Sequence, residues 1–343
     1  MEEYKDFKDF IGRYKERVYM RICDYIPDDD TTFMNGIMRC YVDRKGQYRR
    51  PSYLMLWNML YGGKESEAIL PAAVQQASED WILMHDDILD QNALRRGGPS
   101  AHVMYGTEYA IIGGDALHVV MWRMIRDAAN GLGDRSGRYF DKVYDILFRT
   151  IYGQYLDVRL VKEFNIGNFT EEDYYRSIHM KSAYYSVYGP MQCGAIIAGR
   201  GDNETLKRIE RYGTYAGYAF QIRDDILDCT STEESLGKSI GNDVKEGTKT
   251  LILLHAVQNA SQNVLSRLNE VYSKRSGEKS RDDIRFVLDT FAELGSIRYA
   301  EERAGDFADR AIAEFDRMES GIPESNLKRI ARESIGYAAR RKE

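Results

Sequence analysis

The sequence predicts an all-α protein, and three observations lead to this prediction. The chain has only six prolines in 343 residues, and proline is the residue that most strongly interrupts a helix interior. Few stretches alternate polar and apolar side chains in the way that half-buried strands do. No segment rich in proline, glycine or serine divides the chain, so we expect one domain over residues 1–343.

Composition and charge narrow the class of protein. The net charge is −6, charged residues make up 30% and the mean hydropathy is −0.52, which is typical of a soluble chain. No apolar run is long enough to span a bilayer and no signal peptide begins at Met1, so we expect no stable membrane insertion. The charge pattern gives no indication of nucleic-acid binding. Four scattered cysteines without a CxxC pair favour a reducing, cytoplasmic location.

Helices are expected along the first quarter of the chain, separated by turns. The first ends at Pro27, and Thr31 or Thr32 caps the second, which reaches about Val42. Gly62 and Gly63 separate the next two. The expected helical ranges are 2–26, 31–42, 51–61 and 65–90.

The last of these helices ends in an acidic motif, Asp86, Asp87 and Asp90. Positions i and i+4 of a helix lie on one face, so Asp86 and Asp90 point the same way and Asp87 lies at the edge of that face. Like charges at this spacing destabilise a helix unless a cation lies between them. Carboxylate oxygens suit a hard ion such as Mg²⁺, which typically bridges to substrate phosphates.

The same five letters, DDILD, return at Asp224, Asp225 and Asp228 near the end of a helix expected over 205–228. A single acidic motif is more often a solvated helix face. Both copies, however, follow apolar residues, including Trp81 and Phe220. Two identical motifs in such surroundings indicate a shared ligand.

Other elements are expected between and after the two motifs. Residues Ile111 to Ile125 are predicted to form a buried helix, and Gly131 to Arg138 a loop. Thr170 with Asp173 is expected to cap a further helix. The remaining expectations are a helix from Tyr139 to Lys162 and a glycine-punctuated loop from Leu236 to Thr250.

Basic residues occur where anions could bind. Arg50 lies at the start of a helix, and Arg95 and Arg96 follow the first acidic motif closely. Guanidinium groups bind phosphate through paired hydrogen bonds. Magnesium ions, arginines and an apolar, aromatic interior together suit a ligand with a diphosphate head and an apolar tail. Such a site would stabilise a leaving diphosphate and shield a carbocation from water.

The order of the motifs resembles the trans-isoprenyl diphosphate synthases, which make farnesyl and geranylgeranyl diphosphate. The resemblance runs over nearly the whole chain through GQYRRP, HDDILDQNALRRG, GGDALH, GQYLD, MKSAYYSVYGP, FQIRDDILD and GKSIGND. It implies a single-domain helical bundle around a deep central cavity, a homodimer, and Mg²⁺ as cofactor, with Mn²⁺ as an alternative. It also implies head-to-tail condensation of isopentenyl diphosphate with an allylic diphosphate.

The resemblance also assigns roles by position. The implied metal ligands are Asp86, Asp87, Asp90, Asp224, Asp225 and Asp228. Asp86, Asp87, Lys181 and Asp224 are the implied catalytic residues. The allylic diphosphate is assigned to Arg95, Lys181, Ser182, Gln221 and Lys238, and isopentenyl diphosphate to Arg50 and Arg96.

Three positions depart from the family's pattern. Gln47 stands where the family usually has lysine, Glu79 where it tends to have histidine or glutamine, and Thr248 where lysine is common. A carboxylate near a diphosphate is repulsive unless it is protonated or paired with a cation. Because both Gln47 and Glu79 stand at positions where the family binds isopentenyl diphosphate, we expect this substrate to be bound more weakly or in a different arrangement.

Product length is expected to depend on Trp81, five residues before the first motif, where the family shapes the cavity floor. A bulky tryptophan there implies a short product, geranylgeranyl or farnesyl diphosphate, with the first preferred. An ordinary core tryptophan is the alternative interpretation. Gln47 and Glu79 also keep open a class I terpene synthase or a transferase with another acceptor. A non-catalytic subunit of a heteromeric synthase is less favoured because both motifs are complete.

Overall fold

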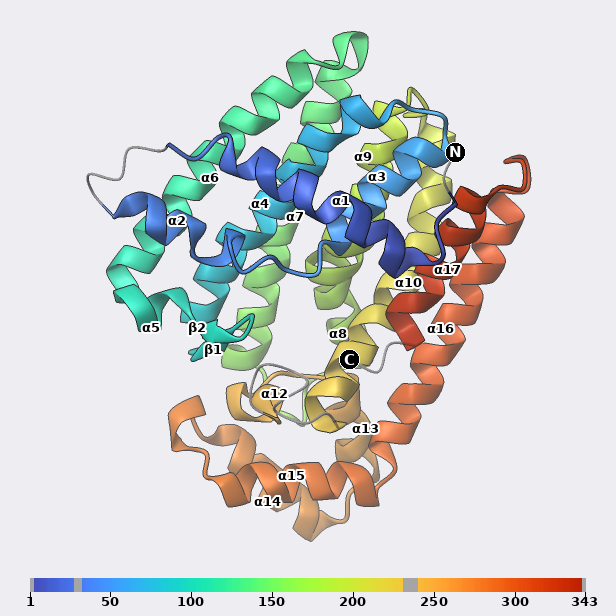
Figure 1. Ribbon diagram of the computed structural model, residues 1–343. Helices are drawn as coiled ribbons and strands as arrows, with labels where there is room; N and C mark the ends of the chain where they lie inside the picture. Colours follow the sequence, from blue (N-terminus) through green and yellow to red (C-terminus); the bar gives the residue numbers. More distant parts are fainter. Residues whose placement is uncertain (1–2, 28–32, 231–239, 341–343) are drawn as a thin grey trace. The chain divides into compact units, whose positions relative to one another are not determined.

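The computed structural model describes residues 3–27, 33–230 and 240–340, the last four of them by backbone alone. Within these ranges the protein is helical almost throughout (Figure 1). The only strands there are β1 (Leu94–Arg95) and β2 (Gly98–Pro99), which pair antiparallel. The all-α prediction is therefore confirmed. Among the same residues, no helix combines the length and the apolar character needed to cross a membrane.

The structure falls into two compact units. Unit 1 comprises residues 1–147, 186–211 and 318–334, and unit 2 comprises 148–185, 212–317 and 335–343. Both acidic motifs are therefore described within their own unit, the first in unit 1 and the second in unit 2. The expectation of one domain over the whole chain stays a prediction.

Unit 1 is built around α4, which packs against α1, α3 and α6, while α3 also packs against α9. Two glycines allow the close approach of α6. A Cβ on Gly113 would lie 2.2 Å from Ile37, and one on Gly114 would lie 2.5 Å from His85. The helices of this unit are α1 (Phe7–Cys23), α2 (Met34–Val42), α3 (Arg49–Leu60), α4 (Glu65–Leu89), α5 (Ala101–Tyr105), α6 (Thr107–Asn130), a 3₁₀ turn (Gly133–Arg135) and α9 (Gly189–Ile197).

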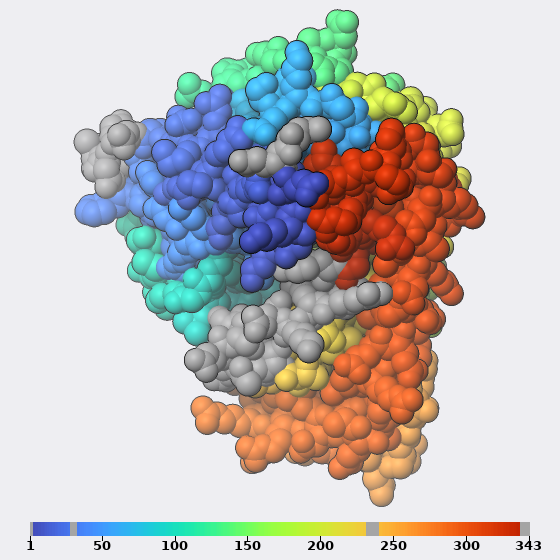
Figure 2. All heavy atoms as spheres, turned by 45° about the vertical axis from the view of Figure 1, so that its right-hand side comes forward, coloured from blue at the N-terminus to red at the C-terminus, as the bar shows by residue number. Residues whose placement is uncertain are grey.

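The N-terminal segment of unit 1 lies against the helix that begins at Asn326. The backbone N–H of Tyr4 donates to the Asn326 side chain at 2.8 Å, and Arg329 donates to the Tyr4 carbonyl at 2.7 Å. In Figure 2 the dark blue and red segments accordingly lie side by side. These contacts fix the start of α1, the helix that carries Lys15.

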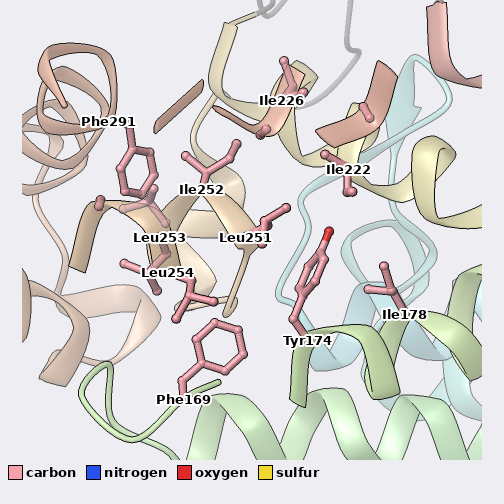
Figure 3. Close-up of a cluster of buried hydrophobic side chains, with 14 of the residues drawn as sticks. Phe169, Tyr174, Ile178, Ile222, Ile226, Leu251, Ile252, Leu253, Leu254 and Phe291 are labelled. Carbon is pink, nitrogen blue, oxygen red and sulfur yellow. The ribbon is translucent and has the colours of Figure 1, made fainter. Parts of the chain in front are cut away.

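Unit 2 has its own apolar core, in which Leu251 to Leu254 meet Phe169, Tyr174 and Ile222 (Figure 3). Within the described residues, five helical elements cross the unit boundary: α7 (Ser136–Glu163), a π-helical segment (His179–Tyr188), α10 (Asn203–Thr230), α16 (Ser296–Met318) and α17 (Asn326–Arg340). The other elements of unit 2 are α8 (Glu171–Ile178), α12 (Asn242–Glu246), α13 (Leu251–Asn259), α14 (Gln262–Ser273), a 3₁₀ turn (Ser276–Glu278) and α15 (Arg281–Glu293).

Most expected helices are present, with boundaries shifted by a few residues. Thr170 and Asp173 form the predicted capping box at the start of α8. The first helix is shorter than predicted because the Asp6 side chain caps it at Phe7. The proposed cap at Thr31 or Thr32 lies outside the described residues. The loop predicted over 131–138 is mostly wrong, since a 3₁₀ turn leads directly into α7 at Ser136.

The prediction of a buried helix over 111–125 is wrong for one face of α6. Leu117, Met121 and Ile125 are buried, but Ile111, Ile112 and Val119 are among the exposed large apolar residues. Apolar residues surround this helix on more than one side, so sequence alone could not show which face meets the core.

Candidate active site

The first acidic motif ends α4, and its three carboxylates have different surroundings. Asp86 and Asp90 are half-buried, whereas Asp87 is fully buried. Asp87 accepts a hydrogen bond from the Tyr41 hydroxyl at 2.6 Å and pairs with the Arg95 guanidinium. The Tyr41 hydroxyl also accepts from the backbone N–H of Ala101 at 2.9 Å. Asp87 is therefore held by protein donors, and the i, i+4 pair Asp86 and Asp90 is the more accessible part of the motif.

A short hairpin directs the two arginines to different carboxylates. β1 and β2 are joined at Arg96 and Gly97, which have φ of +51° and +74°, and positive φ at both central residues is the pattern of a type I′ turn. Arg95 pairs with Asp87, while Arg96 donates to the Tyr41 carbonyl at 2.6 Å. Left-handed backbone at a non-glycine residue is strained, so these contacts hold Arg96 in place.

Four charged side chains of unit 1 form what we call the arginine–carboxylate cluster, consisting of Arg50, Glu79, Asp80 and Arg96. Glu79 lies 2.9 Å from an Arg50 Nη and 3.4 Å from an Arg96 Nη. Asp80 lies 2.8 Å from the other Arg96 Nη and accepts from Gln76. Arg50 also donates to the Ser186 hydroxyl at 2.8 Å. Glu79 is thus paired with the two arginines predicted to hold isopentenyl diphosphate.

The two carboxylates of the cluster differ in pKa. Burial alone would raise the pKa of Glu79, but Arg50, Arg96 and Arg49 hold it below its ordinary value. Burial raises the pKa of Asp80 to about 6, although Arg96 opposes the shift. Asp80 Oδ2 also has no hydrogen-bond donor among the described residues. At neutral pH, with both groups ionised, two positive and two negative charges cancel within the cluster.

Gln47 lies beside this cluster in the chain but is exposed. Its neighbour Gly46 is buried against the Arg96 guanidinium, where a Cβ would lie 2.5 Å from Nη2. Tyr48, which follows, is buried and has a φ of +55°. The glycine at position 46 therefore has a steric function, since a larger residue would displace Arg96.

The second acidic motif ends the part of α10 that belongs to unit 2. Asp225 is buried and accepts from the Tyr174 hydroxyl and from Gln221, both at 2.8 Å. Burial raises the pKa of Asp225, and these donors oppose the shift. Asp228 is also buried and accepts from the backbone N–H of Asp243 at 2.9 Å. Asp224 is half-buried, like Asp86 and Asp90 in the first motif.

Lys181 and Ser182 lie in the π-helical segment His179–Tyr188, a rare conformation that is frequent at functional sites. The Ser182 hydroxyl donates to the Gln221 amide oxygen, which joins it to Asp225 through Gln221. Lys181 pairs with Asp157 of α7. Gly153, one turn earlier on α7, allows this approach, because a Cβ there would lie 2.7 Å from the Lys181 backbone nitrogen.

The loop after α10 is described only in part. Lys238 lies outside the described residues. The backbone N–H of Thr248 donates to the Asp243 carbonyl at 2.8 Å, so this residue closes α12. Lys249 is buried and donates to the Gly247 carbonyl at 2.9 Å. Burial and the nearby Lys279 lower the pKa of Lys249 to about 8.

Trp81 is buried on α4 and stacks on His118 of α6, with ring centroids 4.4 Å apart. His118 in turn accepts from the Trp122 indole N–H at 2.8 Å. The Trp81 indole N–H has no hydrogen-bond partner among the described residues. These contacts pack the Trp81 ring against α6, and its role in product length stays a prediction.

The carboxylates of each motif have the chemistry of magnesium ligands, and their assignment to a metal stays a prediction. No group of three or more acidic, histidine or cysteine side chains is arranged for a metal among the described residues. Mg²⁺ commonly binds through one or two carboxylates, several waters and substrate phosphates. Asp86, Asp90 and Asp224 are half-buried, whereas Asp87, Asp225 and Asp228 are buried, so the first three are the more accessible candidates for such a role.

Several residues that organise the site carry no signal in the sequence. Tyr41 and Tyr174 donate to the second aspartate of each motif, and the Ser186 hydroxyl accepts a hydrogen bond from Arg50. Asp80 pairs with Arg96. Tyrosine is common in this chain, with 25 in total, so only three-dimensional contacts distinguish these two. Each motif begins with two adjacent aspartates, and adjacent residues of a helix face different directions. This pattern does indicate that one of the two carboxylates turns toward the interior.

Comparison with known proteins places this geometry in a family. The polyprenyl synthetase family model matches residues 31–290, a range that includes both complete acidic motifs. The chain belongs to the polyprenyl synthetase family. The predicted resemblance to trans-isoprenyl diphosphate synthases and the prediction of a prenyltransferase are thereby confirmed.

Two relatives align with this polyprenyl synthetase over most of both sequences. The chain is 30% identical to the short chain isoprenyl diphosphate synthase of Methanothermobacter thermautotrophicus, over 94% of this chain and 96% of the relative. It is 32% identical to the geranylfarnesyl diphosphate synthase of Aeropyrum pernix, over 81% and 85%. The crystal structure of geranylgeranyl pyrophosphate synthetase from Pyrococcus horikoshii matches with a TM-score of 0.83 and 27% identity, covering 98% and 99%.

Removing the charge of Glu79 should destabilise the protein and make it more responsive to diphosphate. In Glu79→Gln, Arg50 and Arg96 lose their shared counter-charge, so we expect the free energy of unfolding to fall by about 1–3 kcal/mol. Inorganic pyrophosphate should then raise the unfolding temperature more in the variant than in the wild type, because both arginines become available to it. Thermal unfolding with and without pyrophosphate measures both effects.

The matched control for this comparison is Glu108→Gln, which removes one carboxylate from an exposed position on α6. It should leave the unfolding temperature and the pyrophosphate response unchanged. Equal stabilisation of wild type and Glu79→Gln by pyrophosphate would contradict the view that Glu79 neutralises the diphosphate-binding arginines.

Proposed function

We propose that this polyprenyl synthetase condenses isopentenyl diphosphate head-to-tail with an allylic diphosphate to give geranylgeranyl or farnesyl diphosphate. The observation that supports this most directly is the family match over a range that retains all six motif aspartates together with Arg95 and Arg96. Relatives named short chain isoprenyl diphosphate synthase and geranylgeranyl diphosphate synthase, at about equal identity, support a short product.

In this reaction the bond from the allylic C1 to oxygen breaks, and diphosphate leaves with the electron pair. The double bond of isopentenyl diphosphate then attacks C1, and a proton is lost to restore a double bond. We assign Arg95, Lys181, Ser182, Gln221 and Lys238 to the allylic diphosphate. Within unit 1, the Asp87 contact holds Arg95 in position for a phosphate oxygen. Within unit 2, Asp157 positions the Lys181 ammonium and Gln221 positions the Ser182 hydroxyl.

We expect Asp86, Asp90 and Asp224 to contribute the metal ligands, with Asp87, Asp225 and Asp228 holding each motif in shape. Bound Mg²⁺ would supply positive charge that stabilises diphosphate as a leaving group. We keep magnesium as the predicted cofactor, with manganese as an alternative, and the cytoplasm as the predicted compartment.

Isopentenyl diphosphate is assigned to Arg50 and Arg96 of the arginine–carboxylate cluster. The pairing of Glu79 with both arginines supports the expected alteration of this site, because the diphosphate must compete with an internal carboxylate. A transferase with another acceptor, or a class I terpene synthase, remains the second candidate. Two features favour it. Gln47 provides no positive charge, and Glu79 pairs with both arginines of the site and reduces their net charge.

The central experiment measures incorporation of labelled isopentenyl diphosphate with dimethylallyl, geranyl or farnesyl diphosphate in the presence of Mg²⁺. We expect a short product that chelator abolishes. Asp86→Asn and Asp224→Asn should each lower kcat by roughly 100-fold or more, since each removes charge that stabilises the leaving group. Chromatographic sizing of the products gives rate and length together.

The control for this experiment is Asp289→Asn, which neutralises an exposed aspartate on α15 and should leave kcat unchanged. Consumption of the allylic diphosphate without incorporation of isopentenyl diphosphate would support the second candidate instead. A wild-type protein inactive with all three primers would favour a non-catalytic subunit.

Product length should depend on the Trp81 ring. In Trp81→Ala the space beside His118 opens, so we expect the product distribution to shift to chains longer by one or more isoprene units. Trp81→Phe keeps most of the ring and should shift it less. Because losing a buried tryptophan costs about 3–5 kcal/mol, the assay should be run at low temperature. The readout is the ratio of products, and an unchanged ratio in Trp81→Ala would identify an ordinary core tryptophan.

We further expect a homodimer that covers exposed apolar residues of α6 and of the part of α7 that belongs to unit 1. Ile112 and Val119 lie seven residues apart on α6, while Phe140 and Tyr144 lie one turn apart on α7, and all four are exposed. Contiguous exposed apolar surface typically marks an interface. Ile112→Glu with Val119→Glu should convert dimer to monomer in light scattering. The charge control Asp289→Lys should not, and a monomeric wild type would contradict the proposal.

A further inference from the structure

Lys15 is a half-buried lysine in the middle of α1 that has no carboxylate within ion-pair distance among the described residues. Its ammonium contacts an aromatic ring, as Nζ lies 5.5 Å from the ring centroid of Tyr48. Tyr48 directly follows Gln47 and precedes Arg49 and Arg50. The Lys15 ammonium therefore lies above the segment in which the expected lysine is missing.

The charges around Lys15 are mostly of its own sign. Among the described residues, the charges of Lys45 and Arg96 disfavour the Lys15 ammonium, and the carboxylate of Glu16 favours it. Glu16 is already paired with Lys45, at 2.6 Å. Burial lowers the pKa of Lys15, and Lys45 and Arg96 lower it further. A positive charge in such a position gains free energy when an anion arrives.

The arginine–carboxylate cluster has little net positive charge of its own with which to attract a diphosphate. Glu79 and Asp80 offset the charges of Arg50 and Arg96, so the cluster alone offers a diphosphate little net attraction. Arg49 acts on Glu79 from nearby. Lys15 adds a cation that no described carboxylate neutralises. Lys15 contacts the ring of Tyr48, and Tyr48 directly follows Gln47, where the lysine typical of the family is missing.

We propose that Lys15 supplies the cation that Gln47 does not, and that its ammonium binds the diphosphate of isopentenyl diphosphate together with Arg50 and Arg96. This proposal rests on the proposed function, which assigns that substrate to the cluster. It makes α1 part of the acceptor site, a role that no motif in the N-terminal region indicates.

The test compares Michaelis constants for the two substrates. In Lys15→Gln the KM for isopentenyl diphosphate should rise about tenfold or more, because one charge-assisted contact is lost. The KM for the allylic diphosphate and kcat at saturation should stay unchanged, since the contact binds one substrate uniformly. Lys15→Arg should retain the wild-type KM, and Lys8→Gln, an exposed lysine of the same helix, should have no effect.

A second variant separates binding from folding. In Lys15→Gln with Gln47→Lys, a lysine returns at the position before Tyr48, so the KM for isopentenyl diphosphate should fall back toward the wild-type value. Calorimetry with isopentenyl diphosphate alone should give the same order of affinities without turnover. Equal KM values in wild type and Lys15→Gln, or a parallel rise for both substrates, would overturn the proposal. A wild type that does not incorporate isopentenyl diphosphate would overturn the proposed function instead, while the calorimetric comparison would still report on Lys15.

Discussion

A carboxylate can be buried in a helical protein only when donors surround it, and this requirement organises both acidic motifs. Each motif places adjacent aspartates on a helix, so at least one of each pair must turn toward the interior. Tyr41 and Arg95 supply the donors to Asp87, and Tyr174 with Gln221 supply them to Asp225. The inward aspartate then fixes the end of the helix, which leaves its neighbours, Asp86 and Asp224, half-buried and able to meet a ligand.

The all-α class was predictable because it depends on local sequence, through proline scarcity and the spacing of apolar residues. The i, i+4 rule likewise predicted that Asp86 and Asp90 share one face of a helix with Asp87 at its edge, and the structure gives Asp87 a different environment from the other two. The surroundings of Glu79 were not predictable, since its partners Arg50 and Arg96 come from α3 and from the hairpin after α4. The exposed face of α6 escaped prediction for a similar reason, because apolar residues occupy several of its faces.

The arginine–carboxylate cluster, which we assign to isopentenyl diphosphate, would keep its arginines ordered before a substrate binds. Arginines that converge on one point repel each other, and a nearby carboxylate relieves this repulsion while holding their geometry. The same carboxylate weakens the attraction for an incoming diphosphate. An enzyme with Glu79 therefore gains preorganisation and loses net positive charge, so cations outside the cluster become important for substrate affinity.

The hairpin at Leu94–Pro99 also bears on how such sequences are compared with one another. Arg95 and Arg96 are neighbours in the chain, yet they reach different carboxylates because Arg96 and Gly97 both adopt positive φ. A relative that kept both arginines but replaced Gly97 by a β-branched residue would conserve charge while losing the turn that aims it. The number of basic residues is therefore a poor guide to substrate affinity among homologues. A comparison of their sequences should ask instead whether the residues at this turn can adopt positive φ.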